Sequence, residues 1–144
     1  MYLVDANILI YAANDQSPLH KKANEWLEAA LDGPGQTVGL PWMSLLAYLR
    51  VATNPRLYAV PPSPADVLGV IDDWVERPAA WIPAPGPRHR AHLERQLQEG
   101  LASGKLVTDA HLAALAYEHA LTVVTADRDF ARFPSVRSLN PLAS

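Results

Sequence analysis

Short apolar runs alternate with longer amphipathic runs along this chain, and that alternation restricts the possible folds more than any other feature of the sequence. The short runs predict strands at residues 2–4, 37–40, 81–82, 122–125 and 136–139. The longer runs carry apolar residues at roughly the 3.6-residue period of a helix, and they predict helices that begin near residues 17, 41, 63, 88 and 108. Strands that alternate with helices in this way predict an α/β domain with a mainly parallel central sheet.

Size and charge limit the possible functions. The chain has 144 residues, 49% of them hydrophobic, which suits one domain with its own core, so we expect a single domain over residues 1–144. A net charge of −3 excludes a protein that coats nucleic acid through general positive charge. Any contact with nucleic acid must therefore come from a local group of basic side chains.

The residue types that are missing also limit the function. The chain contains no cysteine, which excludes a disulfide framework and a zinc site built from thiolates. No apolar run reaches the ~18 residues that a membrane span needs, and the N-terminal segment lacks the basic start of a secretory signal. We therefore expect a soluble, cytoplasmic protein without a membrane partner.

Three aspartates lie at element boundaries where ligands commonly bind. Asp5 directly follows the first predicted strand, Asp127 follows the strand at 122–125, and Asp109 opens an alanine-rich helix. The carboxyl ends of parallel strands and the N-termini of crossover helices meet at one edge of such a sheet. The three carboxylates are therefore expected to converge.

Convergence of carboxylates calls for a cation. Two carboxylates ~4 Å apart repel by about 4 kcal/mol at an effective dielectric constant of about 20. Three together raise one another's pKa values and weaken the fold. Carboxylate oxygens, without cysteine or a histidine pair, favour Mg²⁺ or Mn²⁺ over zinc.

Each aspartate also has an interpretation in which it is only structural. Asp109 could complement the dipole of its helix, and Asp127 and Asp129 could be turn formers after a strand. Asp5 is harder to explain in this way, because it follows a buried strand and an unpaired buried carboxylate is costly. With Asn7 it forms a polar pair among apolar neighbours.

Five segments of the chain resemble the VapC-type PIN-domain toxins and occur in the order typical of that family. They are VDANILIYA at 4–12, SPLHKKA at 17–23, LPWMSLLAYLRVATNPR at 40–56, TDAHLAALA at 108–116 and VTADRDF at 124–130. The resemblance implies a three-layer α/β/α fold and an endoribonuclease dependent on Mg²⁺ or Mn²⁺. It also implies a toxin that forms homodimers and is neutralised by a VapB-type antitoxin, in a heterotetramer or a larger complex.

The resemblance also assigns roles to residues. Asp5, Asp109 and Asp127 match the acidic catalytic and metal site of the family, and Asn7 matches the polar residue that supports it. We expect Asp5 and Asp109 to hold the ion and Asp127 to orient or deprotonate the attacking water, which leaves a 5′-phosphate and a 3′-hydroxyl. Basic side chains near the motifs could contact the RNA backbone, although solvated surface charge explains each of them equally well: Arg50, Arg56, Lys105 and Arg128.

One position departs from the family pattern. The family usually has a glutamate a few residues before an arginine on the helix after the second strand, and here Ala47 takes that place before Arg50. Asp129, or Ser44 holding a water molecule of the metal, could compensate. Without compensation, the alternative function is a PIN fold that binds RNA or its antitoxin with weak or no nuclease activity.

A phosphatase with an aspartate nucleophile is an alternative from another class of enzyme. In that interpretation Asp5 would attack a phosphoryl group, with a lysine and phosphate-binding serine or threonine residues close by. The sequence offers no convincing set of such residues.

Overall fold

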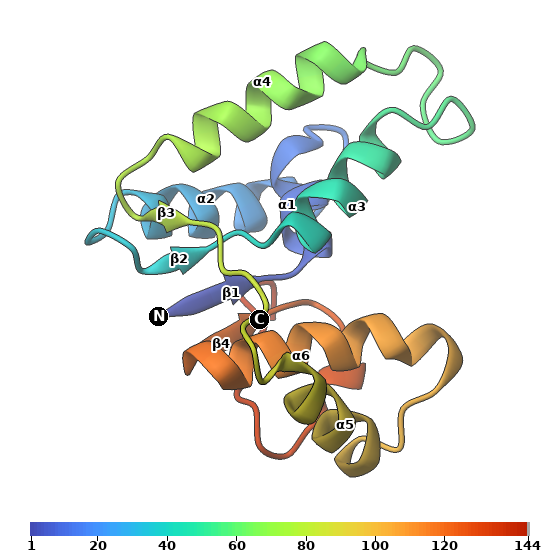
Figure 1. Cartoon of the computed structure of the whole chain (residues 1–144). Helices are drawn as coiled ribbons and strands as arrows, with labels where there is room; N and C mark the ends of the chain where they lie inside the picture. Colours follow the sequence, from blue (N-terminus) through green and yellow to red (C-terminus); the bar gives the residue numbers. More distant parts are fainter. Residues whose placement is uncertain (144) are drawn as a thin grey trace.

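The structure is a computed structural model that describes residues 1–143, and it confirms the α/β prediction (Figure 1). Helices and strands alternate along most of the chain. In chain order the elements are β1 (Tyr2–Val4), α1 (Ala6–Ala13), α2 (His20–Leu31), β2 (Val38–Gly39), α3 (Trp42–Ala52), α4 (Pro64–Val75), β3 (Ala80–Trp81), α5 (His89–Glu99), the 3₁₀ helix η1 (Gly104–Leu106), α6 (Val107–His119), β4 (Thr122–Val124), the 3₁₀ helix η2 (Arg128–Arg132) and β5 (Ser138–Leu139).

The five strands form one parallel sheet in the order β3-β2-β1-β4-β5. β1 is central, and its Val4 lies in register with Val124 of β4. The backbone N–H of Asp5 donates to the carbonyl oxygen of Val124 at 2.9 Å, so the two strands end side by side. The residues that follow β1 and β4 therefore meet at the carboxyl edge of the sheet, as the sequence predicts.

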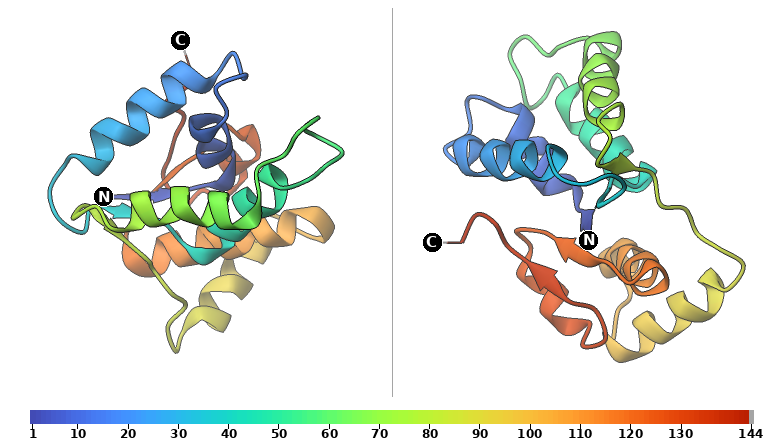
Figure 2. Two further views of the ribbon diagram at one scale, coloured as in Figure 1. Left: turned by 90° about the horizontal axis from the view of Figure 1, so that it is seen from above. Right: turned by 90° about the vertical axis from the view of Figure 1, so that its left-hand side faces the viewer.

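Helices cover both faces of the sheet, with α1 to α4 on one side and α5 and α6 on the other (Figure 2). Each side has its own hydrophobic core, and successive residues of one strand point into different cores. Leu3 and Val123 pack with α6, whereas Val4 and Val124 pack with the helices of the other layer. This arrangement is the three-layer α/β/α architecture that we expected.

The helix starts show where sequence signals succeed and where they fail. Helix α4 begins where predicted, and Ser63 caps it: its Oγ accepts from the backbone N–H of Asp66 at 3.1 Å, and the Asp66 carboxylate accepts from the Ser63 N–H. The predicted start at Ser17 is wrong, because Ser17 caps only a local turn through the N–H of Leu19 and α2 begins at His20.

The sequence pattern predicts no helix over residues 6–13, where the structure has α1. This helix has eight residues and packs against both α2 and α3, so it shows no clear polar face. The sequence nevertheless marks the start of α1, since Asp5 is a residue type that commonly caps helices and is the N-cap here. Within residues 1–143, no helix combines the length and the apolar character that crossing a membrane requires.

Candidate functional site

Asp5 lies at the junction of β1 and α1, and hydrogen bonds fix both of its carboxylate oxygens. Oδ1 accepts from the backbone N–H of Ala6 at 2.7 Å. Oδ2 accepts from the Thr125 hydroxyl at 2.8 Å and from the Asn7 amide at 3.2 Å. Burial raises the pKa of Asp5, and the hydrogen bond from Thr125 opposes this shift. The carboxylate is therefore held in one orientation at the sheet edge.

Thr125 connects the acidic residues, and sequence reasoning missed it. Its hydroxyl, which is buried, donates to Asp5 and accepts from Asn7 at 3.2 Å and from the backbone N–H of Asp127 at 3.0 Å. The Asn7 side-chain oxygen in turn accepts from the N–H of Ala126 at 3.1 Å. A threonine after two valines is typical of a strand, and only the aspartates around it hint at another role.

Asp109, Asp127 and Asp129 form the one group of three acidic side chains in residues 1–143 that could hold a metal ion. Each offers an oxygen that lies within 4.8 Å of the others. Asp109 stands in the first turn of α6, and Asp127 caps η2 by accepting from the N–H of Asp129 at 2.9 Å. Asp5 lies outside this group of three. The structure thus groups Asp129, which we expected only as a compensating acid, with Asp109 and Asp127.

The electrostatics show that these acidic groups act on one another. Burial raises the pKa of Asp109 to about 6, and the negative charges of Asp127, Asp5 and Asp129 contribute to the shift. Arg132 opposes it. The neighbouring negative charges therefore disfavour the charged form of Asp109. The donor set of hard carboxylate oxygens fits a divalent ion such as Mg²⁺ or Mn²⁺.

A pocket of about 400 Å³ opens beside the acidic residues, between the starts of α1, α3 and α6. Asp5 and Asp109 line one part of it, and the α3 residues Ser44, Ala47 and Arg50 line another. Ser44 is buried and donates to the carbonyl oxygen of Val4 at 2.7 Å, which ties α3 to the end of β1. The position of the missing glutamate, Ala47, thus faces the same space as Asp5 and Asp109.

Comparison with known proteins identifies the family. A family model described as PIN domain matches residues 2–136. The chain is 42% identical to Ribonuclease VapC37 of Mycobacterium tuberculosis over 143 residues, which covers 99% of each chain. It is 38% identical to Ribonuclease VapC25 of the same organism, over 98% of this chain and 99% of the relative. The chain belongs to the VapC family of PIN-domain proteins.

Solved structures share the VapC-family fold at low sequence identity. VapBC2 from Rickettsia felis, bound to a DNA fragment from its promoter, aligns with a TM-score of 0.66 at 21% identity and covers 96% of this chain and 97% of that chain. FitAB bound to the IR36 DNA fragment aligns with a TM-score of 0.69 at 19% identity and covers 100% and 97%. These alignments support the three-layer architecture.

The four basic residues near the motif segments are dispersed in the structure. Arg50 lines the pocket that contains Asp5 and Asp109. Arg128 lines a different pocket of about 370 Å³ beside Asp127, and Lys105 is exposed on η1. Arg56 is exposed in the loop after α3, where its N–H donates to Asn54 at 2.9 Å. Among these four, only Arg50 shares a pocket with Asp109.

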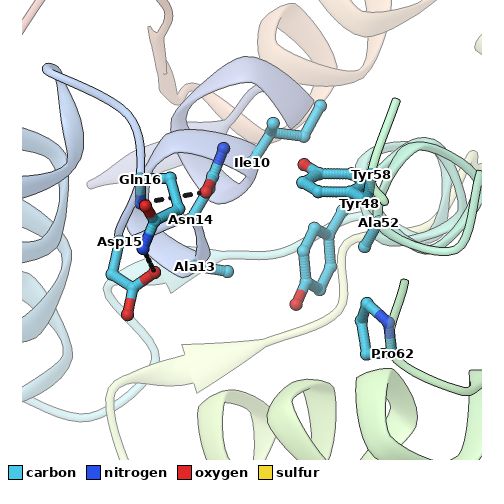
Figure 3. A pocket seen from close by; sticks show the side chains of 9 residues that line it. All are labelled: Ile10, Ala13, Asn14, Asp15, Gln16, Tyr48, Ala52, Tyr58 and Pro62. Carbon is cyan, nitrogen blue, oxygen red and sulfur yellow. Dashed lines mark hydrogen bonds between the residues drawn. The ribbon is translucent and has the colours of Figure 1, made fainter. Parts of the chain in front are cut away.

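Another pocket, of about 210 Å³, lies at the ends of α1 and α3 and contains none of the clustered acids (Figure 3). Tyr48 and Tyr58 line one side, and Asn14 and Asp15 line the other. Burial raises the pKa of Tyr48 to about 12, so its hydroxyl stays protonated. Without a carboxylate cluster or a basic side chain in its lining, this pocket does not suit phosphodiester chemistry.

Proposed function

We propose that this chain is a divalent-metal-dependent endoribonuclease that acts as the toxin of a toxin–antitoxin pair. The observation that carries the proposal is the group of carboxylates at the carboxyl edge of the sheet, where oxygens of Asp109, Asp127 and Asp129 lie within 4.8 Å of one another beside Asp5. Relatives at 32–42% identity over almost the whole chain are named ribonucleases, which supports this activity.

The residues that would hold Mg²⁺ or Mn²⁺ are Asp5, Asp109 and Asp127, with Asp129 as a further ligand. A bound divalent ion lowers the pKa of water and stabilises negative charge on the phosphate and the leaving oxygen. Thr125 and Asn7 keep the Asp5 carboxylate in one orientation, so that it does not have to reorganise during the reaction.

Asp127 and Arg50 carry out the remaining steps of the proposed reaction. Asp127 orients the attacking water or accepts its proton, because its own backbone is fixed by Thr125 and its carboxylate caps η2. Arg50, in the pocket beside Asp109, contacts a phosphate of the RNA backbone. The products carry a 5′-phosphate and a 3′-hydroxyl.

The partners follow from the same family. Solved neighbours are VapBC assemblies, which supports a complex of this chain with a VapB-type antitoxin, built on a homodimer of the toxin. Such a ribonuclease acts in the cytoplasm, where its RNA substrates and its antitoxin are found. Light scattering of the chain alone and with the antitoxin from the neighbouring reading frame tests both assemblies.

The decisive experiment measures cleavage of structured RNA by the purified chain with Mg²⁺ or Mn²⁺, and with a chelator as the control. We expect cleavage that the chelator abolishes and that Asp5→Asn strongly reduces. Cleavage that is unchanged in Asp5→Asn and in the chelator would contradict the proposed mechanism. Sequencing of the fragment ends then identifies the RNA and the bond.

A second function, RNA or antitoxin binding without cleavage, is favoured by one observation: Ala47 leaves the α3 side of the pocket without a carboxylate. RNA binding without cleavage in either metal would support it. The phosphatase interpretation has less support, since both oxygens of Asp5 accept hydrogen bonds and the pocket lining of the described chain offers Arg50 but no lysine.

A further inference from the structure

We propose that Arg132 is a phosphate-binding residue of this site, which holds the RNA backbone beside Asp109 together with Arg50. The inference rests on the proposed nuclease function and adds a residue that the sequence motifs do not mark. It also separates Arg132 from Arg128, which lies on the same short helix but inside the motif segment at 124–130.

The first argument is the geometry of η2. In a 3₁₀ helix, residues three apart lie above one another on the same side. Asp129 and Arg132 therefore share one side of η2, and Arg128 shares another side with Ala131. The structure agrees with this register, because Arg128 and Ala131 line the same pocket next to β5. Asp129, by contrast, points its carboxylate toward Asp109.

The second argument is that the guanidinium of Arg132 is available to a ligand. None of the ion pairs found in residues 1–143 involves Arg132, so its guanidinium is not taken up by a close carboxylate there. Its side chain is exposed at the end of η2 and can reach a ligand in solvent.

The third argument is rigidity. Phe130 and Phe133, on either side of Arg132 in the sequence, are both buried in the core that contains α6. Their rings pack at 5.7 Å between centroids. The backbone that carries Arg132 is therefore fixed relative to Asp109 on α6, as a phosphate-binding residue requires.

The fourth argument is charge balance. Asp5, Asp109, Asp127 and Asp129 bring four carboxylates to one edge of the sheet, and a single divalent ion offsets only part of that charge. An RNA phosphate would still meet net negative charge, so cations must flank the acids. Arg50 on α3 supplies one from one outer layer, and Arg132 on η2 supplies one from the other side of the sheet.

The test measures binding of a short, fluorescent, mixed-sequence single-stranded RNA to the whole chain by anisotropy, with Ca²⁺ in place of Mg²⁺ so that the RNA stays intact. Arg132→Ala should weaken binding about tenfold. It should also reduce the slope of log affinity against log salt by roughly 0.7, the value for one lost phosphate contact on a single strand. Arg132→Lys should restore part of the RNA affinity and part of the salt slope.

Two further variants show whether the effect is specific. Arg137→Ala, an exposed arginine just before β5, should leave both quantities unchanged, and Arg128→Ala should have a smaller effect than Arg132→Ala. Thermal unfolding should not change in Arg132→Ala.

Manganese affinity of the same variant, measured by titration without RNA, should rise roughly threefold because a cation next to the acids has been removed.

The outcomes separate this inference from the proposed function. If Arg132→Ala behaves as Arg137→Ala does, or if Arg128→Ala loses more affinity, then Arg132 does not bind phosphate and the inference is overturned. A wild-type chain that does not bind RNA overturns it as well. Loss of cleavage in Asp5→Asn would still support the nuclease function when Arg132→Ala has no effect.

Discussion

The carboxyl edge of the sheet has two unlike sides. The β4 side, made of Asp5 and residues 125–129, is polar. Hydrogen bonds of the Thr125 hydroxyl connect Asp5, Asn7 and the backbone of Asp127. The α3 side, made of Met43, Ser44, Leu46, Ala47 and Arg50, is mostly apolar, and its buried hydroxyl donates to the backbone of β1. The comparison indicates that chemistry is concentrated on the β4 side, whereas the α3 side shapes the pocket and departs from the family pattern.

The largest effect is expected from Asp109→Asn, because Asp109 lies between the two sides. It shares the pocket with α3 and its oxygen lies in the group with Asp127 and Asp129. RNA cleavage in Mg²⁺ should fall about a hundredfold or more. Asp73→Asn, an exposed aspartate on α4, is the matched control and should cleave normally. Equal activity in both variants would contradict the assignment of the site.

The next effect is expected from Thr125→Val, which keeps the shape of the side chain but removes the hydroxyl that joins the β4 side. Asp5 loses a donor, and the N–H of Asp127 loses its acceptor. We expect cleavage to fall roughly tenfold and the free energy of unfolding to fall by about 1–2 kcal/mol.

Thr122→Val is the matched control for this variant, because Thr122 starts the same strand at the opposite edge of the sheet. Thr122→Val should lower cleavage and the free energy of unfolding by less than Thr125→Val does. Recovery in Thr125→Ser would show that the hydroxyl, rather than the methyl group, is required. If Thr125→Val cleaves as wild type does, the hydrogen bonds of the β4 side have no part in catalysis.

The same contrast explains what the sequence could predict. The sequence could place Asp5, Asp109 and Asp127 at one edge of the sheet, because parallel topology brings strand ends and helix starts together there. It could not show the hydrogen bonds of Thr125 or the grouping of Asp129 with Asp109 and Asp127, since these depend on how the chain turns into η2 after β4. Helix α1 escaped prediction for a similar reason, because burial between α2 and α3 removes the polar face that marks a helix.

A smaller effect is expected from Ala47→Glu, which gives the α3 side the carboxylate that the family usually has. Ala47 faces the pocket with Asp5 and Asp109, so an added carboxylate can reach the same ion. We expect Mn²⁺ affinity and cleavage to increase roughly three- to tenfold. Leu68→Glu, at an exposed leucine on α4 away from this pocket, is the control and should produce no increase. A gain in both variants would indicate a general effect of charge.

The smallest effect is the pH dependence of the metal-free chain. The pKa of Asp109 is raised from 3.8 to about 6 in the folded state, so the folded chain holds a proton that the unfolded chain has released. The melting temperature in a chelator should therefore fall by a few degrees as the pH rises from about 4 to 6. Asp109→Asn should weaken this dependence, and Mn²⁺ should offset the loss above pH 6 by neutralising the β4 side. A melting temperature that instead rises through this range in the wild type, with no change in Asp109→Asn, would show that the pKa of Asp109 is not raised in the folded state.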